Sequence, residues 1–281
     1  MFKGFYTVAT GMIAQQRKTE ILTNNMANTN TPGYKADLGV IRSFPDMLMS
    51  AVKSNQIPTE NGLSTKTLST VGAVNAGVYL QETVADHTQG TISETDLLTD
   101  MALVDELLPV DENSGNRGAI FFRLQSADGQ QESYTRNGNF TRDGAGNLVN
   151  PNGLYVLSAT GETIQLSNDN FTVNPNGTIV DENNNQIAQL GVSFAANPDV
   201  LAKRDNGLFQ TADGEPLPSA YGNEGVMFQV KQYHLEGSNV DSARSMTDLM
   251  VAYRTFEANQ KVLQAYDKSM EKAVNEIGRV N

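Results

Sequence analysis

Residues 238–277 contain neither proline nor glycine, and this uninterrupted run restricts the C-terminal end of the chain more than any other feature of the sequence. Gln260 and Asp267 interrupt a series of apolar residues that recur at alternating spacings of three and four. The apolar members are Met246, Leu249, Tyr253, Phe256, Leu263, Met270, Val274 and Ile277. A mean spacing of about 3.5 over this length predicts one long helix with a narrow coiled-coil seam. The alternative is an ordinary helix packed on a globular core.

The N-terminal segment, residues 4–28, predicts a second and weaker helix. It lacks proline, and its apolar seam consists of Phe5, Val8, Met12, Leu22 and Met26. Gly4 and Gly11 would each weaken such a helix by about 1 kcal/mol relative to alanine. Both ends of the chain are therefore expected to be helical, with the stronger pattern at the C-terminal end.

Boundary signals support both helices. Thr31-Pro32-Gly33 predicts the end of the first helix, because proline disfavours helical backbone in the residue before it and glycine permits a turn. Ser238, followed by Asp241, resembles an N-terminal capping pattern for the second helix. Gly278 follows the last seam residue, as a C-terminal stop often does.

The sequence between the two helices is typical of short antiparallel strands. Asn-Gly and Asp-Gly pairs, which favour tight hairpin turns, begin at residues 128, 137, 143, 152, 176 and 213. They separate the β-type runs Ile120–Leu124, Leu154–Leu157, Phe171–Val173, Thr178–Val180 and Val226–Val230. We predict a barrel-like or sandwich-like domain, an extended arm or long hairpin over 45–75, and a short helix over 95–108.

The predicted fold class is α+β and mainly β, with an antiparallel β-rich central domain and long N- and C-terminal helices that form a coiled-coil-type inner domain. Residues 1–36 are the N-terminal helix of that inner domain, and residues 238–281 are its C-terminal helix. Residues 37–80 form the arm, and residues 81–237 form the β-rich outer domain.

Charge is distributed unevenly between these segments. The net charge is −12; residues 1–36 carry four basic groups and one acidic group, and residues 238–281 carry six of each, so the middle holds −15. Ends with little net charge can pack closely in many copies, whereas an acidic middle stays solvated. The acidic surface also excludes nucleic acid as a partner.

Candidate catalytic and metal sites are few. The chain has no cysteine, and its two histidines, His87 and His234, show no ligand spacing. Residues 181–185 begin like a calcium loop, but Gln186 and Val192 stand where glycine and glutamate are needed. We predict no enzyme activity, no catalytic residue, no cofactor, no metal and no small-molecule substrate. A glycosidase, which needs two carboxylates across a cleft, is the enzymatic alternative.

The sequence lacks the usual membrane and export signals. No run approaches the roughly 18 apolar residues of a membrane helix. The first ten residues have no apolar core or small-residue cleavage pattern, so an ordinary secretory signal is not expected. The alternatives are a cytosolic protein or export by a route that reads the unfolded N-terminus.

A motif at the end of the first helix resembles the signature of bacterial flagellar rod and hook subunits. Its matching residues are Asn25, Ala27, Asn28, Thr31, Gly33, Tyr34 and Lys35. Further stretches are similar to the same family, in the same order: Thr88-Gln89-Gly90, Phe121-Phe122, residues 134–140, residues 147–153 and residues 235–259. The chain departs from the family pattern at about 104–119, where extra residues precede Phe121-Phe122.

The resemblance implies a structural subunit of the flagellar basal-body rod, most like a distal-rod subunit. Such a chain leaves the cell unfolded through the flagellar type III export apparatus, without a cleaved signal peptide. Its terminal helices then form a coiled-coil inner domain around the axial channel, in contact with copies of itself and with other rod and hook proteins. A flagellar hook subunit and an exported β-rich adhesin or binding module are the alternatives.

Overall fold

A computed structural model describes residues 2–57, 63–111, 115–125, 132–166, 168 and 170–277. The fold mixes helix and strand, is mostly strand, and has one helix at each end, which confirms the predicted α+β class. The chain divides into two compact units. The first comprises Met1–Thr23, Gly39–Thr83 and Met246–Asn281, and the second comprises Asn24–Leu38 and Val84–Ser245. Within the described residues, no helix is long and apolar enough to cross a membrane.

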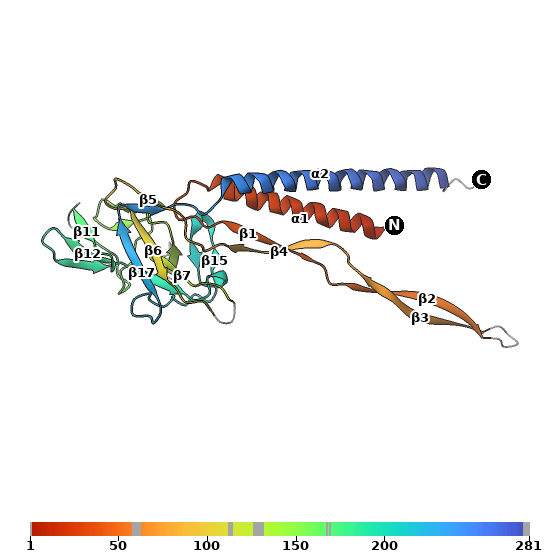
Figure 1. The fold of residues 1–281 in the computed structure, drawn as a ribbon, viewed down its shortest axis with the longest axis horizontal. Helices are drawn as coiled ribbons and strands as arrows, with labels where there is room; N and C mark the ends of the chain where they lie inside the picture. Colours follow the sequence, from red (N-terminus) through yellow and green to blue (C-terminus); the bar gives the residue numbers. More distant parts are fainter. Residues whose placement is uncertain are drawn as a thin grey trace. The chain divides into compact units, whose positions relative to one another are not determined.

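Two long helices dominate the first unit. α1 spans Phe2–Ala27 and α2 spans Ser242–Lys272, followed by a π-helical turn over Ala273–Ile277. They lie side by side and antiparallel, because Gly4 of α1 faces Tyr266 of α2, and Gly11, one heptad later, faces Asn259 (Figure 1). The remainder of the first unit is built from strands on a different side of α1.

Those strands form two two-stranded ribbons, β1 with β4 and β2 with β3. β1 (Asp37–Ser43) pairs with β4 (Val78–Ala85). β2 (Met47–Ile57) and β3 (Leu63–Val74) pair antiparallel along their whole length, with a register shift between Met49 and Ser50 (Figure 1). The segment 45–75, predicted as an arm or long hairpin, therefore consists largely of this two-stranded ribbon.

The second unit is built from short antiparallel strands. A five-stranded sheet has the order β14-β7-β8-β16-β15, and a three-stranded sheet has the order β11-β12-β13. Three two-stranded pairs complete the unit: β17-β6, β18-β5 and β10-β9. The strand bounds are β5 Ile92–Glu94, β6 Met101–Leu107, β7 Ala119–Gln125, β8 Glu132–Thr135, β9 Thr141–Arg142, β10 Leu148–Val149, β11 Phe171–Val173, β12 Thr178–Asp181, β13 Gln186–Gln189, β14 Val192–Ala195, β15 Ala202–Lys203, β16 Phe209–Gln210, β17 Met227–Gln232 and β18 His234–Glu236. Two 3₁₀ turns lie at Pro198–Val200 and Asp205–Gly207.

Strand β7 lies between two apolar clusters, because successive side chains of a strand point to opposite faces. Phe122 packs in the larger cluster, edge-on to Phe140 with ring centroids 5.1 Å apart. Phe121 packs in a smaller cluster with Tyr134 and Phe209. The two adjacent phenylalanines, both fully buried, thus anchor the sheet on both of its faces.

The short helix predicted over 95–108 is wrong. Residues 101–107 form β6, which pairs antiparallel with β17, and Met101, Ala102 and Leu103 are all fully buried. Three consecutive buried residues suit a strand covered on both faces and not one side of a helix. Leu97 and Leu107, which the helical spacing placed on an apolar face, are exposed.

The Gly-containing turns behave in different ways. Gly177 adopts φ +77° in the turn between β11 and β12, as a tight hairpin requires. Gly138 instead lies against a neighbouring strand: a Cβ there would sit 1.6 Å from the Met101 carbonyl oxygen. The Asp128-Gly129 turn lies outside the described residues.

The start of α2 differs from the predicted cap. The Asp241 carboxylate accepts hydrogen bonds from the backbone N–H groups of Ala243 (3.0 Å) and Arg244 (3.1 Å), so Asp241 is the N-cap residue. Ser238 Oγ accepts from the Val240 N–H group instead and closes the turn before the helix. The helix therefore begins four residues later than the sequence pattern predicts.

Replacing the cap should weaken the first turn of α2. We expect Asp241→Ala to lower stability by about 1 kcal/mol, because two amide groups lose their acceptor and the helix dipole loses a favourable charge. Ser238→Ala, the matched control, should cost less. Amide hydrogen exchange over residues 242–246 would measure both, and equal protection in the two variants would contradict the assignment.

Candidate functional site

The family-type motif forms a hydrogen-bonded turn at the end of α1. The buried Asn25 side chain holds both polar groups of the Asp37 backbone: its Nδ2 donates to the Asp37 carbonyl (2.8 Å), and its Oδ1 accepts from the Asp37 N–H group (2.9 Å). Asn28 Nδ2 donates back to the Asn24 carbonyl at 2.9 Å. The chain leaving the helix is thereby tied back onto the helix's last turn.

Tyr34 fills the inside of this turn. Its hydroxyl donates to Asn25 Oδ1 at 3.1 Å, and burial with the nearby Asp37 carboxylate raises its pKa. Lys203 lies over the Tyr34 ring, 4.1 Å from the centroid, and forms an ion pair with Asp37 at 2.7 Å. Strand β15, which carries Lys203, is thus fixed to the segment that follows α1.

Four charged side chains are buried together beside this turn, and we call Lys35, Asp105, Arg136 and Glu236 the charge cluster. Glu236 Oε1 accepts from Lys35 Nζ (2.6 Å) and from the Gly90 N–H group (2.9 Å), and Oε2 accepts from Arg136 Nε (2.7 Å). Arg136 also pairs with Asp105 at 2.9 Å. Lys35, Arg136 and Glu236 are each no more than 2% exposed.

The electrostatics of the cluster are balanced. Burial alone would raise the pKa of Glu236, but Arg136 and Lys35 hold the pKa of that carboxyl below its usual range. Burial alone would lower the pKa of Arg136, but Glu236 and Asp105 raise it. Burial, and next the charge of Arg136, lower the pKa of Lys35, while Glu236 and Asp105 oppose this shift. The remaining donors of Lys35 and Arg136 reach the backbone carbonyls of Thr88 and Ile120.

Glycines allow the segments of the cluster to approach one another. Gly33 has φ +66°, and a Cβ there would lie 2.4 Å from the Asn137 nitrogen; its own N–H group donates to the Glu236 carbonyl at 2.7 Å. A Cβ on Gly90 would lie 2.1 Å from the Gly237 carbonyl oxygen. Backbone contact at both places requires glycine.

Asn239 joins the segment before α2 to the same site. Its Oδ1 accepts from the Ala36 N–H group (2.8 Å), and its Nδ2 donates to the Asp86 carbonyl (2.8 Å). Residues close to the end of α1 and to the start of α2 are therefore held by one set of buried polar contacts.

His87 lies beside the cluster in an aromatic setting. Its ring is 5.7 Å from that of Phe121 and 5.3 Å from that of Phe209, and its buried Nδ1 has no hydrogen-bond partner within the described chain. Burial, together with the charges of Lys35 and Arg136, lowers the pKa of His87 from 6.5 to about 4. The imidazole is therefore neutral at neutral pH.

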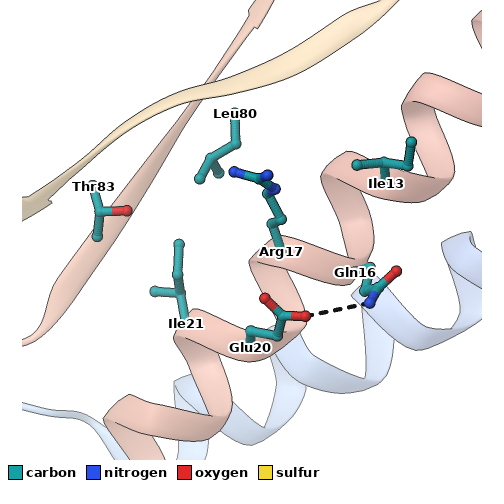
Figure 2. A pocket seen from close by; sticks show the side chains of 7 residues that line it. All are labelled: Ile13, Gln16, Arg17, Glu20, Ile21, Leu80 and Thr83. Atoms are coloured by element: carbon teal, nitrogen blue, oxygen red, sulfur yellow. Dashed lines mark hydrogen bonds between the residues drawn. The ribbon is translucent and has the colours of Figure 1, made fainter.

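The first unit holds a separate feature, a groove of about 480 Å³ between α1 and β4. Figure 2 shows Arg17 pointing towards Leu80, and Gln16 donating to Glu20 at 3.3 Å. Ile13, Ile21 and Thr83 complete its lining. The groove combines aliphatic walls with one cation and one anion.

The predicted seam of α1 is half-buried in the single chain. Phe5, Val8, Met12, Leu22 and Met26 all fall in this class. The most buried residue of the helix is Ala14, which lies outside the seam. Of the motif residues, Asn25, Gly33, Tyr34 and Lys35 are buried, Asn28 is half-buried, and Ala27 and Thr31 are exposed.

The predicted seam of α2 splits into two rows. Leu249, Phe256, Leu263 and Met270, each one heptad apart, are half-buried. Met246, Tyr253 and Val274 are 46%, 53% and 72% exposed, in the same row as the exposed Gln260 and Asp267. Burial of the Ile277 side chain lies outside what the structure describes.

Sequence reasoning did not find the charge cluster. Arg136 and Glu236 lie in stretches that resemble the family, but they are 100 residues apart and nothing in their spacing marks them as partners. Asp105 lies in the segment predicted to be helical. Among the described residues, no three His, Asp or Glu side chains are grouped to hold a metal ion.

Comparison with known sequences gives a consistent result along the chain. Residues 5–35 match the profile described as flagella basal body rod protein, and residues 117–181 match the flagellar hook protein FlgE/F/G D1 domain. Residues 231–276 match the flagellar basal body rod FlgEFG protein C-terminal profile. The first match contains the turn residues Asn25 to Lys35, and the last contains Glu236 and all of α2.

Full-length relatives agree with these profiles. The chain is 44% identical to the flagellar hook-basal body complex protein FlhO of Bacillus subtilis over 280 residues, which is 100% of both chains. It is 32% identical to the flagellar basal-body rod protein FlgG of Agrobacterium fabrum, over 92% of this chain and 94% of that one. The FlgG protein of Borreliella burgdorferi is 30% identical over 98% of each chain.

The profiles and relatives define a structural protein of the bacterial flagellum. The chain belongs to the flagellar basal-body rod and hook protein family.

Removing one charge from the cluster should be costly. We expect Lys35→Met to lower the free energy of unfolding by about 3 kcal/mol, because Glu236 keeps a buried charge with one cation fewer. Lys203→Met breaks the more exposed pair with Asp37 and should cost about 1 kcal/mol. Urea unfolding of the full chain measures both, and equal losses would contradict the central role of the cluster.

Stability should also depend on pH through His87. Because its folded-state pKa of about 4 lies below the unfolded value of 6.5, the unfolded chain takes up this proton first. Stability should fall as pH drops from about 6.5 towards 4, by at most about 3 kcal/mol. Relative to the parent chain, His87→Gln should flatten this part of the unfolding profile. An identical pH profile for His87→Gln would refute the assignment.

Proposed function

We propose that this chain is a structural subunit of the flagellar basal-body rod, distal-rod-like, which polymerises through α1 and α2 into the hollow axial shaft between motor and hook. The observation that supports this most directly is the apolar surface left open on the helices. Met250, Val251 and Val262 of α2 are exposed, in addition to Met246, Tyr253 and Val274. Tyr6 and Ile13 are exposed on α1.

Exposed apolar residues at this density indicate contact with further protein. Past the exposed Met250, one side of α2 carries only polar residues, at Arg254, Glu257, Lys261, Gln264 and Lys268. A coiled-coil-type arrangement would pack the half-buried row of α2 within the subunit and the exposed row against a neighbouring copy. Gln260 and Asp267 would then fix the register between copies, because a polar seam residue selects one alignment at a cost in stability.

The charge distribution supports the same arrangement. The near-neutral α2 segment, with six basic and six acidic groups over residues 238–281, can be packed in many copies without strong repulsion. The acidic middle of the chain, with a net charge of −15, would stay solvated. The groove beside Arg17 and Glu20 would receive side chains of a neighbouring subunit.

The proposal includes the route and the partners. The chain would leave the cell through the flagellar export apparatus without a cleaved signal peptide, and it would contact copies of itself and other rod and hook subunits. It would act as a structural protein and carry out no catalysis, a role supported by its similarity to flagellar rod and hook proteins.

Its position in the flagellum can be tested by deleting its gene and imaging purified basal bodies by electron microscopy. A rod that stops short, without a hook, is expected for a distal-rod subunit. A complete rod that lacks only the hook would favour the hook-subunit alternative, and intact flagella would favour the adhesin alternative.

A single substitution tests the exposed row. We expect Tyr253→Asp to leave the unfolding free energy within about 0.5 kcal/mol of the parent, because the side chain is largely exposed. It should nevertheless abolish incorporation into basal bodies and swimming, because a charge would be buried between copies. Gln264→Asp adds the same charge to the polar side of α2 and should be tolerated. Normal incorporation of the Tyr253→Asp variant would contradict the proposed interface.

A further inference from the structure

On the face of α1 that meets α2, two glycines leave gaps that side chains of α2 occupy, and we call these gaps notches. Gly4 and Gly11 stand one heptad apart, as do Asn259 and Tyr266 on α2. A Cβ on Gly4 would lie 2.3 Å from the Tyr266 hydroxyl oxygen, and a Cβ on Gly11 would lie 3.3 Å from Asn259 Nδ2. A Cβ at position 4 would therefore overlap the Tyr266 hydroxyl, and a Cβ at position 11 would make a tight contact with the Asn259 amide.

We propose that Gly4 and Gly11 are positioning residues that set the register of the antiparallel α1–α2 pair by receiving Tyr266 and Asn259. The inference rests on the proposed function only in its consequence: the register decides which α2 residues remain exposed for a neighbouring copy. The glycines therefore contribute to pairing specificity in return for the helix propensity that they lose.

Steric fit distinguishes the observed register from its alternatives. Shifting α2 by one heptad in one direction puts Tyr266 against Gly11, but it leaves Gly4 facing Ala273 and brings Asn259 to Lys18. The opposite shift brings Asn259 to Gly4 and carries Tyr266 beyond the start of the notched face. Shifts by other amounts place the Tyr266 ring against larger side chains such as Val8. Only the observed alignment fills both notches with the side chains that fit them.

The heptad repeat of α2 explains why the helix pair needs a feature that fixes its register. Seven residues rise about 10.5 Å along an α-helix, so a heptad slip moves every contact by that distance while keeping the same faces together. The half-buried row of α2, Leu249 to Met270, repeats every seven residues and offers similar apolar contacts in each slipped alignment. Apolar contacts alone therefore select the face, and the two glycines select the alignment along it.

The chain lacks cysteine, so engineered pairs report the register without background. In the purified full chain, Gly11→Cys with Asn259→Cys should form a disulfide rapidly under mild oxidation, because these positions face each other. Gly11→Cys paired with Ala252→Cys, or with Tyr266→Cys, reports the two alignments displaced by one heptad and should cross-link severalfold less. Equal or faster cross-linking of a displaced pair would overturn the proposal, as would the absence of cross-linking in all three.

The role of the notches is tested by adding side-chain volume to α1 and then removing it from α2. Adding Gly4→Leu to the Gly11→Cys, Asn259→Cys background should reduce the in-register yield severalfold or shift it towards a displaced pair. Adding Tyr266→Ala as well should restore the yield, since the volume added to α1 is removed from α2. Thr7→Leu, which places the same leucine side chain at an exposed α1 position, is the control and should change nothing.

Failure of this inference is distinguishable from failure of the proposed function. Cross-linking is read in the isolated chain and needs no assembly. An unchanged yield in the Gly4→Leu variant would refute the register role even if Tyr253→Asp blocks incorporation. In-register cross-linking that responds to Gly4→Leu, combined with normal incorporation of Tyr253→Asp, would uphold the register and refute the proposed interface.

Discussion

The second unit depends on the contacts made by the buried carboxylate of Glu236. It accepts from Lys35, Arg136 and the Gly90 backbone, so one side chain joins segments that lie up to 201 residues apart. A carboxylate buried to this extent is stable only when its charge is matched and its lone pairs are occupied. Both conditions are met. The cluster therefore connects the chain that leaves α1 to β6, to the end of β8 and to β18, and each connection depends on the others.

The rest of the site follows from bringing those segments together. Backbone can approach backbone closely only where no Cβ intervenes, and Gly33 and Gly90 supply those points. Asn25 and Asn239 then satisfy the backbone groups that the close approach would leave without partners. The motif at the end of α1 therefore holds the chain that leaves the helix against the strands of the second unit.

The helices show how a sequence pattern can be right about an element and incomplete about its contacts. The α2 spacing of three and four predicts one seam, but the single chain half-buries only the Leu249–Met270 row and leaves the Met246–Val274 row open. Two rows, each with members seven residues apart, can contact two neighbouring helices, and a lone chain supplies only one of them. Gly4 and Gly11, which count against a helix by propensity, are accounted for by the side chains of α2 that lie over them.

The sequence by itself determined both terminal helices, the turn at residues 31–33 that follows α1, the antiparallel strands and the family, because these follow from local backbone preference, periodicity and short motifs. It misplaced 95–108, since an apolar run of that length suits helix and strand alike until β17 pairs with it. Only the tertiary structure decided the partners of Lys35, Arg136 and Glu236 and the facing of Gly4 with Tyr266. Such contacts join residues far apart along the chain. Polar groups prefer these partners only after burial has removed the water that would otherwise bind them.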